Sequence, residues 1–138
     1  MTTLGVYLIF HGTCEAALNF YAAALGGEVV SLPRLGEIMP DADEAIKNRV
    51  INGVLKAGEI TLMASDTYME TPVPFGDNVN IILNFTDRDA LTKAFTALSE
   101  GGTVTMPLQD TPLNATFGSL TDKFGTPWMM SFEKPAVV

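Results

Sequence analysis

An internal duplication limits this chain to folds made of two similar modules in tandem. An offset of about 74 residues aligns the two halves without a gap. It pairs Leu8 with Ile82, Tyr21 with Phe95, Gly27 with Gly101, Val30 with Val104 and Pro33 with Pro107. The predicted halves are residues 1–65 and 79–134, joined by a linker at 66–78 within a single domain spanning residues 1–138.

Each half is expected to contain a strand, a helix and three further strands, an α+β arrangement of two βαβββ modules. The first half is predicted to hold a strand over 7–10, a helix over 14–25 capped by Thr13, a strand over 28–33 and a hairpin within 52–63. The second is predicted to hold a strand over 81–85, a helix over 88–100 capped by Thr86 or Asp87, a strand over 103–107 and a hairpin within 117–130. The loop over 34–47 is expected to contain one helical turn, and whether this loop and the linker 66–78 act as lids is left open.

The last predicted strand is apolar on both faces, which is unusual for a half-buried strand. Trp128, Met129, Met130 and Phe132 are interrupted only by Ser131. Both faces must therefore be covered. We expect Trp128, Met130 and Phe132 to pack under the helices and Met129 to face the other side of the sheet.

Composition excludes several classes of protein. The 138 residues are 47% hydrophobic and 17% charged, which excludes a disordered chain, and no apolar run reaches the roughly 20 residues of a membrane span. A net charge of −8 opposes nucleic-acid binding. The single cysteine, Cys14, forms neither an internal disulfide nor a thiolate metal cluster. Because residues 1–10 lack a basic leader, a cytoplasmic location without membrane partners is predicted.

Several segments together resemble the PhnB-like branch of the vicinal oxygen chelate superfamily, which includes glyoxalases, bleomycin-resistance proteins and extradiol dioxygenases. They are LIFHGTCEAALNFYAAALGG, TLMASD, TVTMPLQDT and FGSLTDKFGTPWMMSF, and they span nearly the whole chain. The resemblance implies that each four-stranded module curls into half a cup, with its helix outside and the ligand inside. It also implies a homodimer.

Metal enzymes of this superfamily place one ligand on the first strand and one on the last strand of each half. The resemblance transfers these four positions to Val6, Asn80, Leu62 and Met129. A divalent metal held in this way prefers imidazole or carboxylate ligands, and three of the four side chains offer no nitrogen or oxygen donor at all. No metal and no other cofactor is therefore expected.

Strand alternation and the positions carried over from the superfamily predict which side chains line the cup. The expected ligand-binding residues are Val6, Leu8, Phe10, Leu62, Asn80, Ile82, Asn84, Met129 and Ser131. In an apolar cup the two amides need partners, which are either the ligand or neighbouring strands and water.

Three other side chains carry reactive groups. Glu133 shares the strand parity of Met129 and is the one weak candidate for a general base. His11 is expected on the helix side of the first strand, in a structural or solvent-facing role. Cys14, in the first helical turn, is expected to be a packing residue rather than a nucleophile.

The leading functional hypothesis is a metal-free, homodimeric protein that binds a small organic ligand in an apolar cup. The alternative is a metal-independent lyase or isomerase, with Glu133 as base and Asn80 and Asn84 stabilising an oxyanion. A third hypothesis is a structural or partner-binding protein whose cup is filled by its own methionines.

Overall fold

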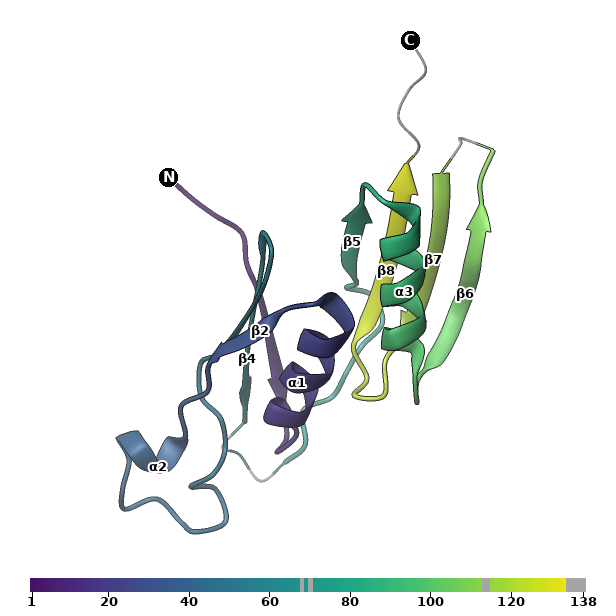
Figure 1. Cartoon of the computed structure of the whole chain (residues 1–138). Helices are drawn as coiled ribbons and strands as arrows, with labels where there is room; N and C mark the ends of the chain where they lie inside the picture. Colours follow the sequence, from purple (N-terminus) through teal and green to yellow (C-terminus); the bar gives the residue numbers. More distant parts are fainter. Residues whose placement is uncertain (68, 70, 113–114, 134–138) are drawn as a thin grey trace. The chain divides into compact units, whose positions relative to one another are not determined.

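The chain forms two compact units, Met1–Pro74 and Phe75–Val138, each with a helix on one face of a four-stranded sheet (Figure 1). This computed structural model describes residues 1–67, 69, 71–112 and 115–133. Residues 68 and 70 of the expected linker, and residue 134 of the expected second half, lie outside the described part.

The first unit contains the elements expected of the first half. In chain order they are β1 (Val6–Phe10), α1 (Cys14–Leu25), β2 (Glu28–Ser31), α2 (Leu35–Ile38), β3 (Gly53–Ala57) and β4 (Ile60–Asp66). The strand order is β1-β4-β3-β2, with β1 parallel to β4 and the other pairs antiparallel. The short helix α2 lies at the start of the loop over 34–47, before residues 40–46, where the helical turn was expected. In that later segment the backbone nitrogen of Lys47 donates to the oxygen of Asp43 over 3.1 Å.

The second unit repeats this plan without a counterpart to α2 among the described residues. Its elements are β5 (Ile81–Phe85), α3 (Arg88–Ser99), β6 (Thr103–Asp110), β7 (Ala115–Thr121) and β8 (Pro127–Glu133). The strand order is β5-β8-β7-β6, and β5 runs parallel to β8. The α+β class and the tandem βαβββ modules are thus confirmed. Within the described residues, no helix is both long enough and apolar enough to cross a membrane.

In the first unit, α1 covers the sheet face that carries Gly53. A Cβ atom added at Gly53 would lie 2.8 Å from Cδ1 of Leu18 in α1, so this glycine allows the helix to approach the sheet. Gly53 pairs with Ala64, and Leu55 pairs with Leu62, on the same face. The side chains of Leu55, Leu62 and Ala64 are buried, and they form the core beneath α1.

In the second unit, α3 covers the corresponding face. A Cβ atom at Gly118 would lie 2.9 Å from Cε2 of Phe95 in α3. Met130 pairs with Gly118 and shares this face with Trp128 and Phe132. All three side chains are buried, which confirms the expected packing of the last strand under the helix.

The gap-free alignment of the two halves is wrong by one residue at the first strand, and the separate matching of the hairpins on their glycines is wrong by one residue at the last strand. Three residues, His11–Thr13, connect β1 to α1, but only Thr86 and Asp87 connect β5 to α3. Likewise, Gly53 pairs with Ala64, eleven residues on, whereas Gly118 pairs with Met130, twelve residues on. Because successive strand residues point to opposite faces, each single-residue difference inverts the face assigned to a whole strand.

Candidate functional site

Four of the expected cup residues lie on the helix-covered face of the first sheet, which corrects the predicted orientation. Val6 pairs with Leu62, and Leu8 and Phe10 follow at alternate positions of β1. Phe10 is 1% exposed and Leu62 is 3% exposed, so both belong to the core under α1. Met63, rather than Leu62, is the counterpart of Met129.

The open face of the first sheet carries a different set of β1 side chains. Tyr7 and Ile9 are 44% and 43% exposed, and they pair with Met63 and Ser65 of β4. The Tyr7 hydroxyl donates a hydrogen bond to Oδ1 of Asn52 over 2.8 Å. This face therefore offers apolar side chains and one oriented phenol at β1, next to polar side chains such as Lys56 and Thr61, which pair across β3 and β4.

The open face of the second sheet carries four expected site residues in the predicted orientation. The strand register forms two rows across β5, β8 and β7, and the rows are Ile82–Met129–Ser119 and Asn84–Ser131–Phe117. Ile82 is 49% exposed, Asn84 is exposed, and the other four side chains are half-buried. No side-chain hydrogen bond involves Asn84 among the described residues, so its amide is available to another molecule.

The remaining two candidates lie at strand ends. Asn80 precedes β5, contrary to the expected strand position, and its Nδ2 donates to the backbone oxygen of Asp77 over 3.3 Å. Glu133 is the last residue of β8, is exposed and pairs with Ala115. This carboxylate is therefore open to solvent rather than enclosed in a site.

The four positions expected for metal ligands do not form one set of donors. Val6 and Leu62 are neighbours in the core, Asn80 lies outside β5, and Met129 is on the open face. The residues at the corrected first-unit positions, Tyr7 and Met63, offer a phenol and a thioether. Among the described residues, no group of three or more His, Cys, Asp or Glu side chains lies close enough to bind a metal.

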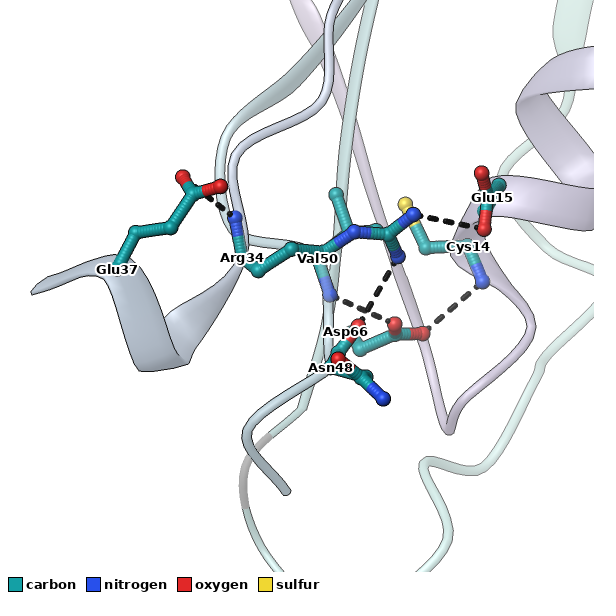
Figure 2. A network of polar contacts seen from close by, with 7 residues as sticks. All are labelled: Cys14, Glu15, Arg34, Glu37, Asn48, Val50 and Asp66. Atoms are coloured by element: carbon teal, nitrogen blue, oxygen red, sulfur yellow. Dashed lines mark hydrogen bonds and ion pairs between the residues drawn. The ribbon is translucent and has the colours of Figure 1, made fainter. Parts of the chain in front are cut away.

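A buried carboxylate organises the polar end of the first unit (Figure 2). Asp66, the last residue of β4, is 5% exposed. Its Oδ1 accepts hydrogen bonds from the backbone nitrogens of Gly12 and Cys14 over 2.8 and 2.9 Å, and its Oδ2 accepts one from Val50 over 3.0 Å. Two of these donors precede or begin α1, where unpaired N–H groups and the helix dipole favour a negative charge.

Arg34 lies beside this carboxylate and holds three segments together (Figure 2). Its Nη2 lies 2.8 Å from Oε1 of Glu15 in α1, and its Nη1 donates to the backbone oxygen of Asn48 over 3.0 Å. Its backbone nitrogen donates to Oε2 of Glu37 over 3.2 Å at the start of α2. This arginine therefore connects α1 with both ends of the loop over 34–47.

Cys14 is fully buried, and its thiol is held in the protonated form. Burial raises the pKa of this thiol to about 12, and the nearby carboxylates of Asp66 and Glu15 act in the same direction, whereas Arg34 acts against them. His11 lies in the connection from β1 to α1, and its Nε2 is 3.5 Å from Nη2 of Arg49.

Sequence reasoning missed Asp66, Arg34 and Arg49 because their partners are distant in the sequence. One available signal was the acidic residue that ends the otherwise uncharged strand ITLMAS, since a buried strand end rarely carries an unpartnered carboxylate.

Comparison with known proteins agrees with this fold. The family model described as Glyoxalase/Bleomycin resistance protein/Dioxygenase superfamily matches residues 3–130 of the chain. The chain belongs to this superfamily.

Two solved structures and one further protein are similar to the chain. Protein PA1353 from Pseudomonas aeruginosa is 34% identical, with a TM-score of 0.86 over 98% of this chain and 100% of that chain. A putative 3-demethylubiquinone-9 3-methyltransferase, PhnB protein, from Bacillus cereus is 26% identical, with a TM-score of 0.79 over 95% of this chain and 99% of that chain. Protein YjdN of Escherichia coli (strain K12) is 27% identical over 140 residues, 95% of either protein. The resemblance to the PhnB-like branch is thereby confirmed.

Proposed function

We propose that this superfamily member binds a small organic molecule with an apolar body and a polar group, without a metal, against the open faces of its sheets. The observation that carries the proposal is the pair of rows on the second sheet. Ile82 and Met129 offer exposed apolar surface beside the amide of Asn84 and the hydroxyl of Ser131. Apolar walls with a few oriented polar groups are typical of small-molecule sites.

The side chains on these faces also suit a ligand of variable shape. Met129 and Met63 are flexible and polarisable, and both lie on open faces. Burying Ile82 and Met129 under a ligand would remove apolar surface from water, at about 25 cal/mol for each Å². Asn84 and Ser131 would fix the orientation of the ligand through hydrogen bonds.

Two further activities receive less support. Glu133 is exposed at a strand end, so no observation favours it as a catalytic base. Methyl transfer from a nucleotide-like donor calls for a glycine-rich loop between a strand and a helix. Among the described residues, the three connections from a strand to a helix, 11–13, 32–34 and 86–87, contain one glycine in total.

Binding of an uncharged apolar dye, Nile red, tests the proposal. We expect a saturable rise in fluorescence with wild-type protein, and an affinity loss on the order of 10-fold in Ile82→Asp, because a carboxylate there opposes apolar contact. Thr92→Asp, on the exposed side of α3, is the matched control and is expected to bind as wild type. Absence of saturable binding, or equal losses in both variants, would overturn the proposal.

Native mass spectrometry of freshly purified protein provides a second test. We propose that the chain is a homodimer, and we expect a dimer mass that includes a co-purifying organic molecule and no metal. A monomeric mass would contradict the dimer. A dimer that carries a stoichiometric transition metal would contradict the metal-free site.

A further inference from the structure

A cavity lies in the first unit, at the carboxyl ends of the parallel strands β1 and β4. Its volume is about 350 Å³, and it is lined by Gly12, Glu15, Arg34, Ala45, Asn48, Arg49 and Asp66. This volume lies within the range of about 300–1,000 Å³ that is typical of ligand pockets. Parallel strands of α/β sheets present their ligand sites at this end, next to the start of the following helix.

The cavity brings two arginines together in an acidic protein, beside two carboxylates, Glu15 and Asp66. The chain carries a net charge of −8 and only three arginines, and two of them, Arg34 and Arg49, line this cavity. Arginine offers a planar set of donors that matches carboxylate and phosphoryl oxygens. Both guanidinium groups belong to residues that are partly buried, where their charge is screened less than at an open surface.

The two carboxylates of the wall already have partners. Asp66 accepts hydrogen bonds from three backbone nitrogens, which stabilise its negative charge. Glu15 forms an ion pair with Arg34. These acids therefore oppose an incoming anion less than two free carboxylates would.

Arg49 has no such carboxylate partner within the part of the chain that the structure describes. Its Nη1 donates to the backbone oxygens of Thr67 and Met69, and its Nη2 lies 3.5 Å from Nε2 of His11. Among the described residues, the ion pairs of the chain involve Arg34, Lys47 and Arg88, but not Arg49. Backbone carbonyls orient a guanidinium without neutralising its charge, so Arg49 is preorganised to accept an anionic partner.

We infer that this cavity binds the oxyanion group of a small molecule, a carboxylate or a phosphoryl group, with Arg49 as its charge partner. Asn48 lines the same wall and supplies an amide donor. The inference is independent of the proposed apolar site, because that site lies on the open sheet faces whereas this cavity lies at the ends of β1 and β4.

Titration of the ¹⁵N-labelled full chain with sodium phosphate and, separately, sodium acetate tests this inference by nuclear magnetic resonance. Chloride keeps the ionic strength constant. We expect saturable shifts of the Arg49 Nε–H and Gly12 amide signals with one anion or both. Response to phosphate alone assigns a phosphoryl ligand, response to acetate alone assigns a carboxylate, and response to both supports the shared chemistry.

Variants at Ala45 test the location without removing any existing contact. Ala45 is exposed on the cavity wall, so Ala45→Glu adds a negative charge there and Ala45→Gln is its neutral control of similar size. We expect Ala45→Glu to weaken anion affinity by about 10-fold relative to Ala45→Gln. Arg49→Gln should lose affinity by a similar factor, whereas Arg88→Gln in the second unit should not. Shifts that do not saturate, or equal affinity in the two Ala45 variants, would overturn the inference.

Discussion

The Oδ1 atom of Asp66 lies 2.9 Å from the backbone nitrogen of Cys14, so a carboxylate at the end of β4 caps α1. Thr13 occupies the expected N-cap position, but its side chain makes no capping hydrogen bond. The start of α1 is thereby tied to a strand that lies 52 residues further along the chain. In the second unit, by contrast, Asp87 caps α3 locally through the nitrogens of Asp89 and Ala90.

Asp66→Asn should lower the free energy of unfolding by about 2–4 kcal/mol, because an amide presents one acceptor oxygen in place of two charged ones. Urea denaturation measures this change. Asp41→Asn is the control, because Asp41 is exposed and should change stability by no more than about 0.5 kcal/mol. Equal effects of the two substitutions would contradict the capping role of Asp66.

The corrected orientation of the first sheet predicts that shortening a side chain to alanine lowers the free energy of unfolding more on the helix-covered face than on the open face. Leu62→Ala should destabilise by about 2–5 kcal/mol, because it opens a cavity under α1. Ile9→Ala should cost less than about 1.5 kcal/mol, because Ile9 is 43% exposed on the open face. Chemical denaturation of both variants decides between the two orientations. A larger loss for Ile9→Ala would restore the orientation expected from the sequence.

Cys14 should react slowly with iodoacetamide in the native state and readily in urea. The thiolate is the reactive form, and a pKa of about 12 leaves almost none of it at neutral pH. Mass spectrometry of timed samples measures the rate. Native labelling as fast as in urea would show that this thiol is not buried.

The same pKa shift gives a stability change with a defined sign. The unfolded thiol loses its proton near 9.0 and the folded one near 12, so the folded state binds more protons between these values. The contribution of this thiol to the free energy of unfolding is fully present below pH 9, and it is lost as the pH rises from about 9 to about 12. Cys14→Ser lacks this thiol, and the difference between its unfolding curve and that of wild type should change over that interval.

Trp128 and Asp122 should be energetically coupled. Nε1 of Trp128 donates to Oδ2 of Asp122 over 2.7 Å, and both residues are buried at the turn between β7 and β8. Trp128→Phe should cost about 1–3 kcal/mol, because it leaves that oxygen without its donor. A double-mutant cycle with Asp122→Asn measures the coupling, which we expect to exceed about 0.5 kcal/mol. Additive losses would show that the hydrogen bond contributes nothing.

The sequence was sufficient to predict the elements and their order. Apolar spacing and glycine pairs gave α1 its exact limits, Cys14–Leu25, and placed β5 at Ile81–Phe85. These signals are local, so they do not depend on how distant segments pack.

The orientation of the strands could not be predicted in the same way. Val6, Leu8 and Phe10 are as apolar as Tyr7 and Ile9, so neither face of β1 is marked by polarity. The assignment therefore depended on the alignment of the halves, and two connections of unequal length made that alignment fail. The polar end of the first unit was missed for a related reason, because Asp66 and Arg34 meet their partners only after folding.

The different lengths of the β1–α1 and β5–α3 connections have a consequence for engineering the two modules. Adding or deleting one residue between β1 and α1 would exchange the side chains of the open sheet face with those that face α1. A chimera that transplants a strand from one module into the other must therefore bring its adjoining turn, or the side chains of the open face will be turned inward.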